Sequence, residues 1–135
     1  MNVRPSPNFD ARPQGRAPDM IVLHYTGMKS GDEALSRLCD PASRVSAHYF
    51  IDEDGTLTRL VAETMRAWHA GQAFWQGEED INGCSIGIEL QNPGHEFGYR
   101  AFPETQIQSL IALIKSIRTR FAVPDARILG HSDVA

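Results

Sequence analysis

Short apolar runs along the chain predict three buried strands. Met20 to Leu23 are apolar and lead into a polar cluster that Gly27 closes, a pattern typical of a buried strand. Residues 84–90 alternate and are rich in β-branched side chains, and residues 127–131 form another short apolar run that ends in a histidine. We expect a strand in each of these segments.

A periodic segment over residues 103–121 predicts the longest helix of the chain. Pro103 suits the first turn of this helix, and Pro124 blocks its continuation. Its apolar side chains recur at steps of three and four residues, which places them on one face. This predicted stripe consists of Ile107, Leu110, Ile111, Ile114, Ile117 and Phe121.

Two further segments complete the predicted architecture. Residues 30–41 predict a shorter helix with Ser30 or Asp32 as its N-cap. Residues 47–61 predict a hairpin, because two β-prone runs flank a turn at Gly55, and glycine tolerates a positive φ angle. Strands mixed with helices, including a long helix before the last strand, indicate one α/β domain with a mixed central sheet flanked by helices.

The remaining segments carry no periodic pattern. Residues 1–19 contain four prolines among polar residues and predict an extended N-terminal arm, so that the domain itself covers residues 20–135. Residues 67–83, which are rich in aromatic residues and glycine, and residues 93–102 predict two long loops. We assign no chemistry to His95 in the second loop.

Composition excludes several classes of partner. The chain has 135 residues, is 41% hydrophobic and carries a net charge of -4, so we expect one globular domain and no nucleic-acid partner. No apolar stretch is long enough to span a bilayer, and the first 20 residues lack the apolar core of a secretory signal. These features favour a cytoplasmic protein, with a periplasmic one still open. Cys39 and Cys84 fit no paired spacing, so we expect reduced thiols. The oligomeric state stays open.

Three residues with metal or acid–base chemistry share one context. His24, Glu89 and His131 each follow an apolar, strand-like run and each lead into a loop. Strand ends are where clefts form in open α/β sheets, so these side chains converge if their strands are neighbours. Two imidazoles and a carboxylate are what a catalytic zinc needs. A lone histidine at a strand end is more often a packing residue, so the spacing by itself leaves both readings open.

Five ordered blocks of sequence resemble a known enzyme family. The segments IVLHYTG, VSAHYFIDEDG, AWHAG, INGCSIGIELQN and ILGHSDVA occur in that order with fitting gaps. Together they resemble the zinc-dependent N-acetylmuramoyl-L-alanine amidases of the amidase-2 family, with the AmpD- and AmiD-like bacterial enzymes as the nearest branch. The resemblance covers roughly residues 8–135. It implies the fold shared with bacteriophage T7 lysozyme and the peptidoglycan recognition proteins. It also implies hydrolysis of the bond between N-acetylmuramic acid and L-alanine in peptidoglycan or anhydro-muropeptide fragments.

The resemblance also implies roles for single residues. His24 and His131 match two zinc ligands, and Glu89 matches the acidic residue that acts on the attacking water. Arg44 matches an arginine that holds the stem peptide, whereas a solvated surface arginine is the alternative. Trp68 and His69 match a loop that lines the substrate groove.

Ordinary structural roles compete with these assignments. Trp68 is also typical of a core aromatic residue. His69 and His48 could equally be buried histidines bonded to the backbone. Asn82 is expected to brace its loop rather than to contact substrate.

The end of the sequence departs from the family pattern. In the family, the GHSDVA block continues into a segment whose aspartate is the third zinc ligand and whose lysine or arginine stabilises the oxyanion. The chain ends at Ala135, so we expect an amidase domain truncated before this segment, weak zinc binding and impaired activity, unless Asp133 substitutes as a ligand. A non-catalytic module that binds peptidoglycan or muropeptides is the alternative function, and a merely structural domain is a third.

Overall fold

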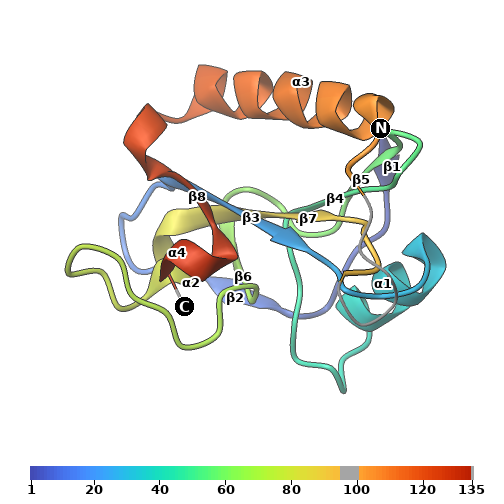
Figure 1. The fold of residues 1–135 in the computed structure, drawn as a ribbon. Coiled ribbons are helices and arrows are strands. Elements are labelled where there is room, and N and C mark those ends of the chain that lie inside the picture. Colours follow the sequence, from blue (N-terminus) through green and yellow to red (C-terminus); the bar gives the residue numbers. More distant parts are fainter. Residues whose placement is uncertain (95–100, 135) are drawn as a thin grey trace.

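The computed structural model describes residues 1–94 and 101–134, which are arranged around a six-stranded mixed sheet (Figure 1). His95 and most of the second predicted loop lie outside the described residues. The strands are β1 (Asn2–Val3), β2 (Phe9–Ala11), β3 (Met20–Tyr25), β4 (Tyr49–Ile51), β5 (Leu57–Arg59), β6 (Met65–Ala67), β7 (Ser85–Leu90) and β8 (Ile128–Gly130). The helices are α1 (Gly31–Leu38), α2 (Ile81–Cys84), α3 (Glu104–Arg120), the short 3₁₀ turn η1 (Asp125–Arg127) and α4 (His131–Val134).

The main sheet has the strand order β1-β5-β4-β7-β3-β8, and its centre is parallel. Strand β3 pairs in parallel with β7 on one side and with β8 on the other, and β4 pairs in parallel with β7. Strands β4 and β5 form the predicted antiparallel hairpin, whose turn places Gly55 at a φ of 88°. The predicted α/β class and the mixed sheet are therefore confirmed.

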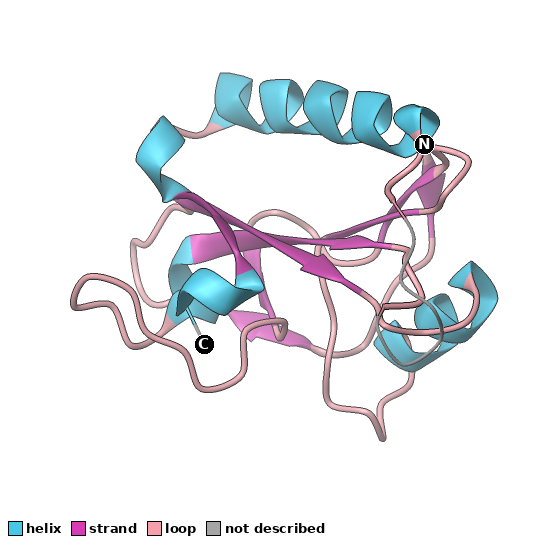
Figure 2. Cartoon of the chain, viewed as in Figure 1, coloured by secondary structure: helices cyan, strands magenta, loops and turns pink. Residues whose placement is uncertain are grey.

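The two faces of the sheet are covered differently (Figures 1 and 2). Helix α3 lies across one face and packs on the apolar side chains of β3, β4 and β7, among them Ile21, Ile51 and Ile88. Helices α1, α2 and α4 lie on the other face, together with the small second sheet of β2 and β6. A strand alternates its side chains between the two faces of a sheet. Because Ile21 and Ile88 face α3, the candidate residues His24 and Glu89 lie on the second face.

The buried stripe of α3 differs in part from the predicted one. Ile111 is 42% exposed, so its place in the predicted stripe is wrong. Gln106 is fully buried instead, and its side-chain amide donates to the carbonyls of Ile51 and Gln91 at 3.0 Å each. These two bonds fix the rotation of the helix above β4 and β7. The buried residues of α3 are Gln106, Leu110, Leu113 and Ile117.

The N-terminal arm is extended, and it packs against the domain through two strand pairings that the sequence pattern did not show. Strand β1 runs parallel to β5, and β2 pairs antiparallel with β6. The side chain of Asn8 donates to the carbonyls of Asp40 and Val45 at 2.9 and 2.8 Å. Further along the arm, the Arg12 guanidinium donates to the carbonyls of Glu63 and Ser85. The arm thereby ties the start of β7 to the second sheet.

The start of α1 agrees with the expected N-cap. Helix α1 begins after Ser30, whose hydroxyl accepts the backbone N–H of Glu33 at 3.2 Å, so Ser30 is the N-cap. Cys39 and Cys84 are free thiols. Within residues 1–94 and 101–134, no helix has the length and apolar character that crossing a membrane requires.

Candidate active site

The pairing of β3 with β7 places two of the candidate residues side by side. His24 and Glu89 are direct register partners on these parallel strands. Side chains at paired positions of neighbouring strands point to the same face, so both side chains enter the face opposite α3. His131 is the first residue of α4 and follows directly on β8, the other neighbour of β3. The topology therefore brings all three residues to the carboxyl ends of three neighbouring parallel strands.

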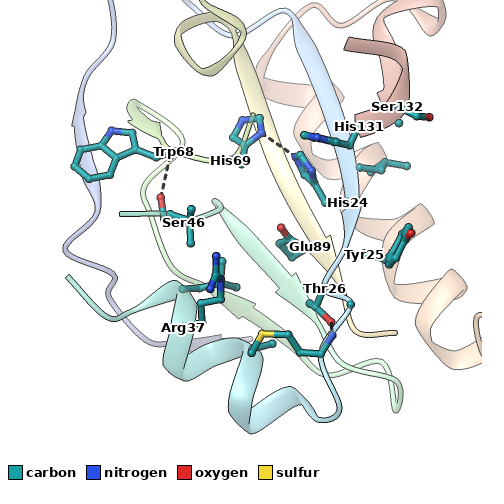
Figure 3. Close-up of a pocket in the computed structure, with 17 residues that line it drawn as sticks. His24, Tyr25, Thr26, Arg37, Ser46, Trp68, His69, Glu89, His131 and Ser132 are labelled. Atoms are coloured by element: carbon teal, nitrogen blue, oxygen red, sulfur yellow. Dashed lines mark hydrogen bonds between the residues drawn. The ribbon is translucent and has the colours of Figure 1, made fainter. Parts of the chain in front are cut away.

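These side chains line one open cavity of about 620 Å³ (Figure 3). The imidazole centroids of His24 and His131 lie 4.9 Å apart, with the rings tilted by 48°. Figure 3 shows His24 between His69 and His131, and Glu89 beside them in the same cavity. The spatial convergence expected from the strand-end pattern is thus present, while the chemical roles of the three residues remain proposals.

The surroundings of Glu89 disfavour the charged form of its side chain. Its Oε2 atom is buried and has no hydrogen-bond partner among the described residues. Burial raises the pKa of this carboxyl from 4.5 to about 8, and the opposing charge of Arg37 offsets only part of that effect. A carboxyl group with a pKa near neutrality in a cavity is typical of a general acid or base.

The two imidazoles differ in exposure. His24 is 8% exposed, whereas His131 lies at the open side of the cavity. Burial, together with the nearby charge of His131, lowers the pKa of His24 to about 3. His24 is therefore a neutral imidazole at physiological pH, which is the form that binds a metal ion.

The donor set fits a metal ion in part. The paired imidazoles suit zinc, which accepts nitrogen donors. No group of three His, Cys, Asp or Glu that could hold a metal is present in the part of the chain that the structure describes. Asp133, the expected substitute, instead accepts the backbone N–H of Gly130 at 2.9 Å through its Oδ2 atom. In this arrangement Asp133 caps the start of α4.

Trp68 and His69 lie between two cavities. Both line the cavity that contains Glu89 and also a second one of about 320 Å³. Arg44 lines only the second cavity, and its backbone has a positive φ of 55°. The structure therefore separates Arg44 from the His24–Glu89–His131 cluster by the Trp68 loop.

Arg37 is a candidate that sequence reasoning missed. It lies in the last turn of α1 and lines the main cavity, where its side chain points toward Glu89 (Figure 3). Among the described residues lining this cavity, it is the one arginine or lysine. The only signal in the sequence is a cation on the polar side of an amphipathic helix, which is also typical of an ordinary solvated residue.

Two other polar residues, Asn82 and His48, have structural roles. The Asn82 side-chain oxygen accepts the backbone N–H groups of His69 and Ala70 at 3.0 and 2.9 Å, so it braces the loop. His48 is fully buried; its Nδ1 atom accepts the N–H of Gly87, and its Nε2 atom lies 2.8 Å from the Met65 carbonyl. The prediction of a loop-bracing Asn82 is confirmed.

Comparison with known proteins supports the sequence resemblance. A family model described as N-acetylmuramoyl-L-alanine amidase matches residues 14–135. The 1,6-anhydro-N-acetylmuramyl-L-alanine amidase AmpD of Citrobacter freundii is 32% identical over 148 residues, covering 97% of this chain and 77% of that relative.

Solved structures agree with the sequence matches. A crystal structure of a selenomethionine derivative of AmpD has a TM-score of 0.86 and 32% identity, covering 99% of this chain and 82% of that one. The amidase AmiD from E. coli was solved with the substrate anhydro-N-acetylmuramic acid-L-Ala-D-γ-Glu-L-Lys. It has a TM-score of 0.76 and 33% identity, covering 91% of this chain and 52% of that one. The resemblance and the fold are thereby confirmed.

The raised pKa of Glu89 predicts a pH-dependent stability difference between the metal-free wild type and Glu89→Gln. Between pH 4.5 and about 8 the folded protein keeps a proton on Glu89 that the unfolded chain has lost. Wild-type stability therefore falls relative to the variant as the pH rises through this window, by at most about 1.4 kcal/mol per pH unit. Urea unfolding with a chelator present, at several pH values, measures the difference. A constant difference from pH 5 to 8 would contradict the buried, protonated carboxyl.

Proposed function

Because the chain belongs to the N-acetylmuramoyl-L-alanine amidase family, we propose that it hydrolyses the amide bond between N-acetylmuramic acid and L-alanine in muropeptides. The observation that supports this most directly is the buried, unpartnered carboxylate oxygen of Glu89 beside the His24–His131 pair. Burying a polar atom without a partner lowers the stability of the fold. Such an atom is therefore expected where a ligand or a reaction requires it.

His24 and His131 are the residues that would hold a zinc ion in this chain. Their rings lie close together at the cavity, and His24 is neutral. When bound, zinc acts as a Lewis acid and brings the pKa of a water molecule from about 16 toward about 7. Two protein ligands are fewer than the three of most catalytic zinc sites.

Glu89 is the proposed general base and acid. Its carboxylate takes a proton from the attacking water and passes it to the amine of the leaving L-alanine. A pKa near 8 suits both transfers, because a group that titrates near the working pH can accept and then return a proton. The same burial excludes bulk water from one side of the reaction and strengthens the electrostatic interactions there.

Arg37, Trp68 and Arg44 are the proposed substrate contacts. The AmiD complex holds a stem peptide with a γ-linked D-glutamate, which leaves that residue's α-carboxylate free. Arg37 lies in the cavity with Glu89 and offers a planar guanidinium for such a carboxylate. Trp68 separates this cavity from the one that contains Arg44, so a longer stem passes along the indole toward Arg44.

A muropeptide-binding module without catalysis is the second candidate. The finding that favours it is the pair of metal-ligating imidazoles without a third partner among the described residues. The two functions differ in their dependence on metal. Muropeptide binding that persists in EDTA, without any cleavage after zinc is restored, would favour the binding module.

Glu89→Gln is expected to reduce kcat for anhydromuropeptide hydrolysis by roughly 10²- to 10⁴-fold, because the amide cannot accept the proton. Chromatographic release of the stem peptide measures the rate, and binding of the same muropeptide by calorimetry should be retained. The isosteric replacement keeps the shape of the cavity, so its melting temperature is the control. Turnover within threefold of wild type would rule out Glu89 as the base.

His24→Ala and His131→Ala are each expected to weaken zinc binding at least about tenfold, because one of two imidazole ligands is lost. Competition with a chromophoric chelator measures the affinity. Asp133→Asn is the matched control; it retains an oxygen that can accept the Gly130 N–H, and its affinity should equal that of wild type. Equal zinc affinity in all these proteins would refute the two-histidine site.

Arg37→Ala is expected to raise KM for an anhydromuropeptide about 10- to 100-fold, since a charge-assisted hydrogen bond to a carboxylate contributes about 1.5–3 kcal/mol. Arg44→Ala should have a smaller effect, because Arg44 lines the neighbouring cavity. Arg118→Ala removes the same charge from α3, where Arg118 pairs with Asp125, and serves as the control. An unchanged KM in Arg37→Ala would remove Arg37 from the binding site.

A further inference from the structure

A chain of hydrogen bonds leads from His24 away from His131 (Figure 3). His24 Nε2 lies 2.9 Å from His69 Nδ1, and His69 Nε2 lies 2.9 Å from the hydroxyl of Ser85. That hydroxyl in turn lies 2.6 Å from the carbonyl oxygen of Ile81 in α2. Two imidazoles and a serine thus connect the proposed metal site to a backbone carbonyl.

The chain has one consistent direction of proton donation. The Ile81 carbonyl can only accept, so the single hydroxyl proton of Ser85 points to it. Ser85 therefore accepts from His69 Nε2, which must carry the proton of the neutral His69 ring. This leaves His69 Nδ1 as an acceptor, and His24 Nε2 must donate to it. The proton of neutral His24 is then on Nε2, and its Nδ1 keeps a free lone pair.

This assignment treats both rings as neutral imidazoles, each with one N–H and one lone pair.

The position of the His69 ring is determined by its surroundings. The ring lies directly on Gly87 of β7, where an added Cβ would collide with the Cγ and Cδ2 atoms of His69. The backbone N–H of His69 is held by the side chain of Asn82. Gly87 thus supplies the space and Asn82 fixes the loop. Both ring nitrogens of His69 are already engaged within the protein.

We propose that His69 is a positioning residue, which fixes the orientation and the Nε2-protonated tautomer of His24 so that the Nδ1 lone pair is presented as the ligand atom. The role rests on the proposed function, and it replaces the substrate contact that the sequence resemblance implied for His69. Metal-binding histidines usually donate their second N–H to a carboxylate, a carbonyl or water. Here a neutral imidazole takes that place, and Ser85 fixes which of its nitrogens accepts.

The test reads the tautomer of His24 directly in metal-free protein. Multiple-bond ¹⁵N–¹H correlation spectra distinguish a protonated from an unprotonated ring nitrogen, and the chain has five histidines to assign. Wild type should show His24 protonated on Nε2. His69→Phe should produce a mixture of tautomers and weaken zinc binding about 10- to 100-fold. Ser85→Ala removes only the acceptor of His69. It should change the His24 tautomer and the zinc affinity in the same direction as His69→Phe, but to a smaller extent.

Ile86→Val is the matched control, because Ile86 lies on the same strand but on the α3 face. It should lower the melting temperature without changing the His24 tautomer or the zinc affinity. A wild-type His24 protonated on Nδ1 would overturn the proposal, and so would an unchanged tautomer in His69→Phe. If His69→Phe fails to fold, an unchanged tautomer in Ser85→Ala has the same consequence. The tautomer is read without metal or substrate, so the absence of hydrolysis would contradict the proposed function and leave this result intact.

Discussion

The parallel pairing of β3 with β7 is the constraint on which the site depends. Its register sets Met20 opposite Ser85, Val22 opposite Gly87 and His24 opposite Glu89. A shift by one residue would turn His24 and Glu89 to different faces of the sheet. The register is held by the other face, where Ile21, Ile86 and Ile88 are completely buried beneath α3. Apolar packing on one face thus specifies the polar geometry on the other.

Strand β7 shows how one segment serves both purposes. Ile86, Ile88 and Leu90 face α3, whereas Ser85, Gly87 and Glu89 lie on the opposite face of the strand. The three positions on this face differ in what they contact: the Ser85 hydroxyl lies 2.9 Å from His69 Nε2, Gly87 leaves room for the His69 ring, and the Glu89 carboxyl lines the cavity. The size and polarity of alternate residues therefore meet three distinct steric and chemical requirements along about 13 Å of strand.

Much of the fold was predictable because it depends on local patterns. The central strands, the β4–β5 hairpin and the Ser30 cap follow from periodicity and turn chemistry, and the strand-end positions of His24, Glu89 and His131 were visible in the sequence. The role of Gln106 was not, since a polar residue becomes part of a buried stripe only when distant carbonyls are available to it. Arg37 was missed for a related reason: whether α1 directs a cation to solvent or into a cavity is decided by packing.

The charge states of Glu89 and the neighbouring imidazoles depend on one another, because these groups share one cavity. A buried carboxyl without a partner favours its protonated form, and buried imidazoles favour their neutral form. The side chains of Glu89, His24 and His69 therefore contribute little net charge to the cavity. A cation placed at the imidazole pair changes this balance, because it favours the carboxylate form of Glu89 by direct attraction. If the proposed function holds, binding the cation and converting Glu89 to its carboxylate form are one electrostatic event, which requires both groups to share one poorly solvated cavity.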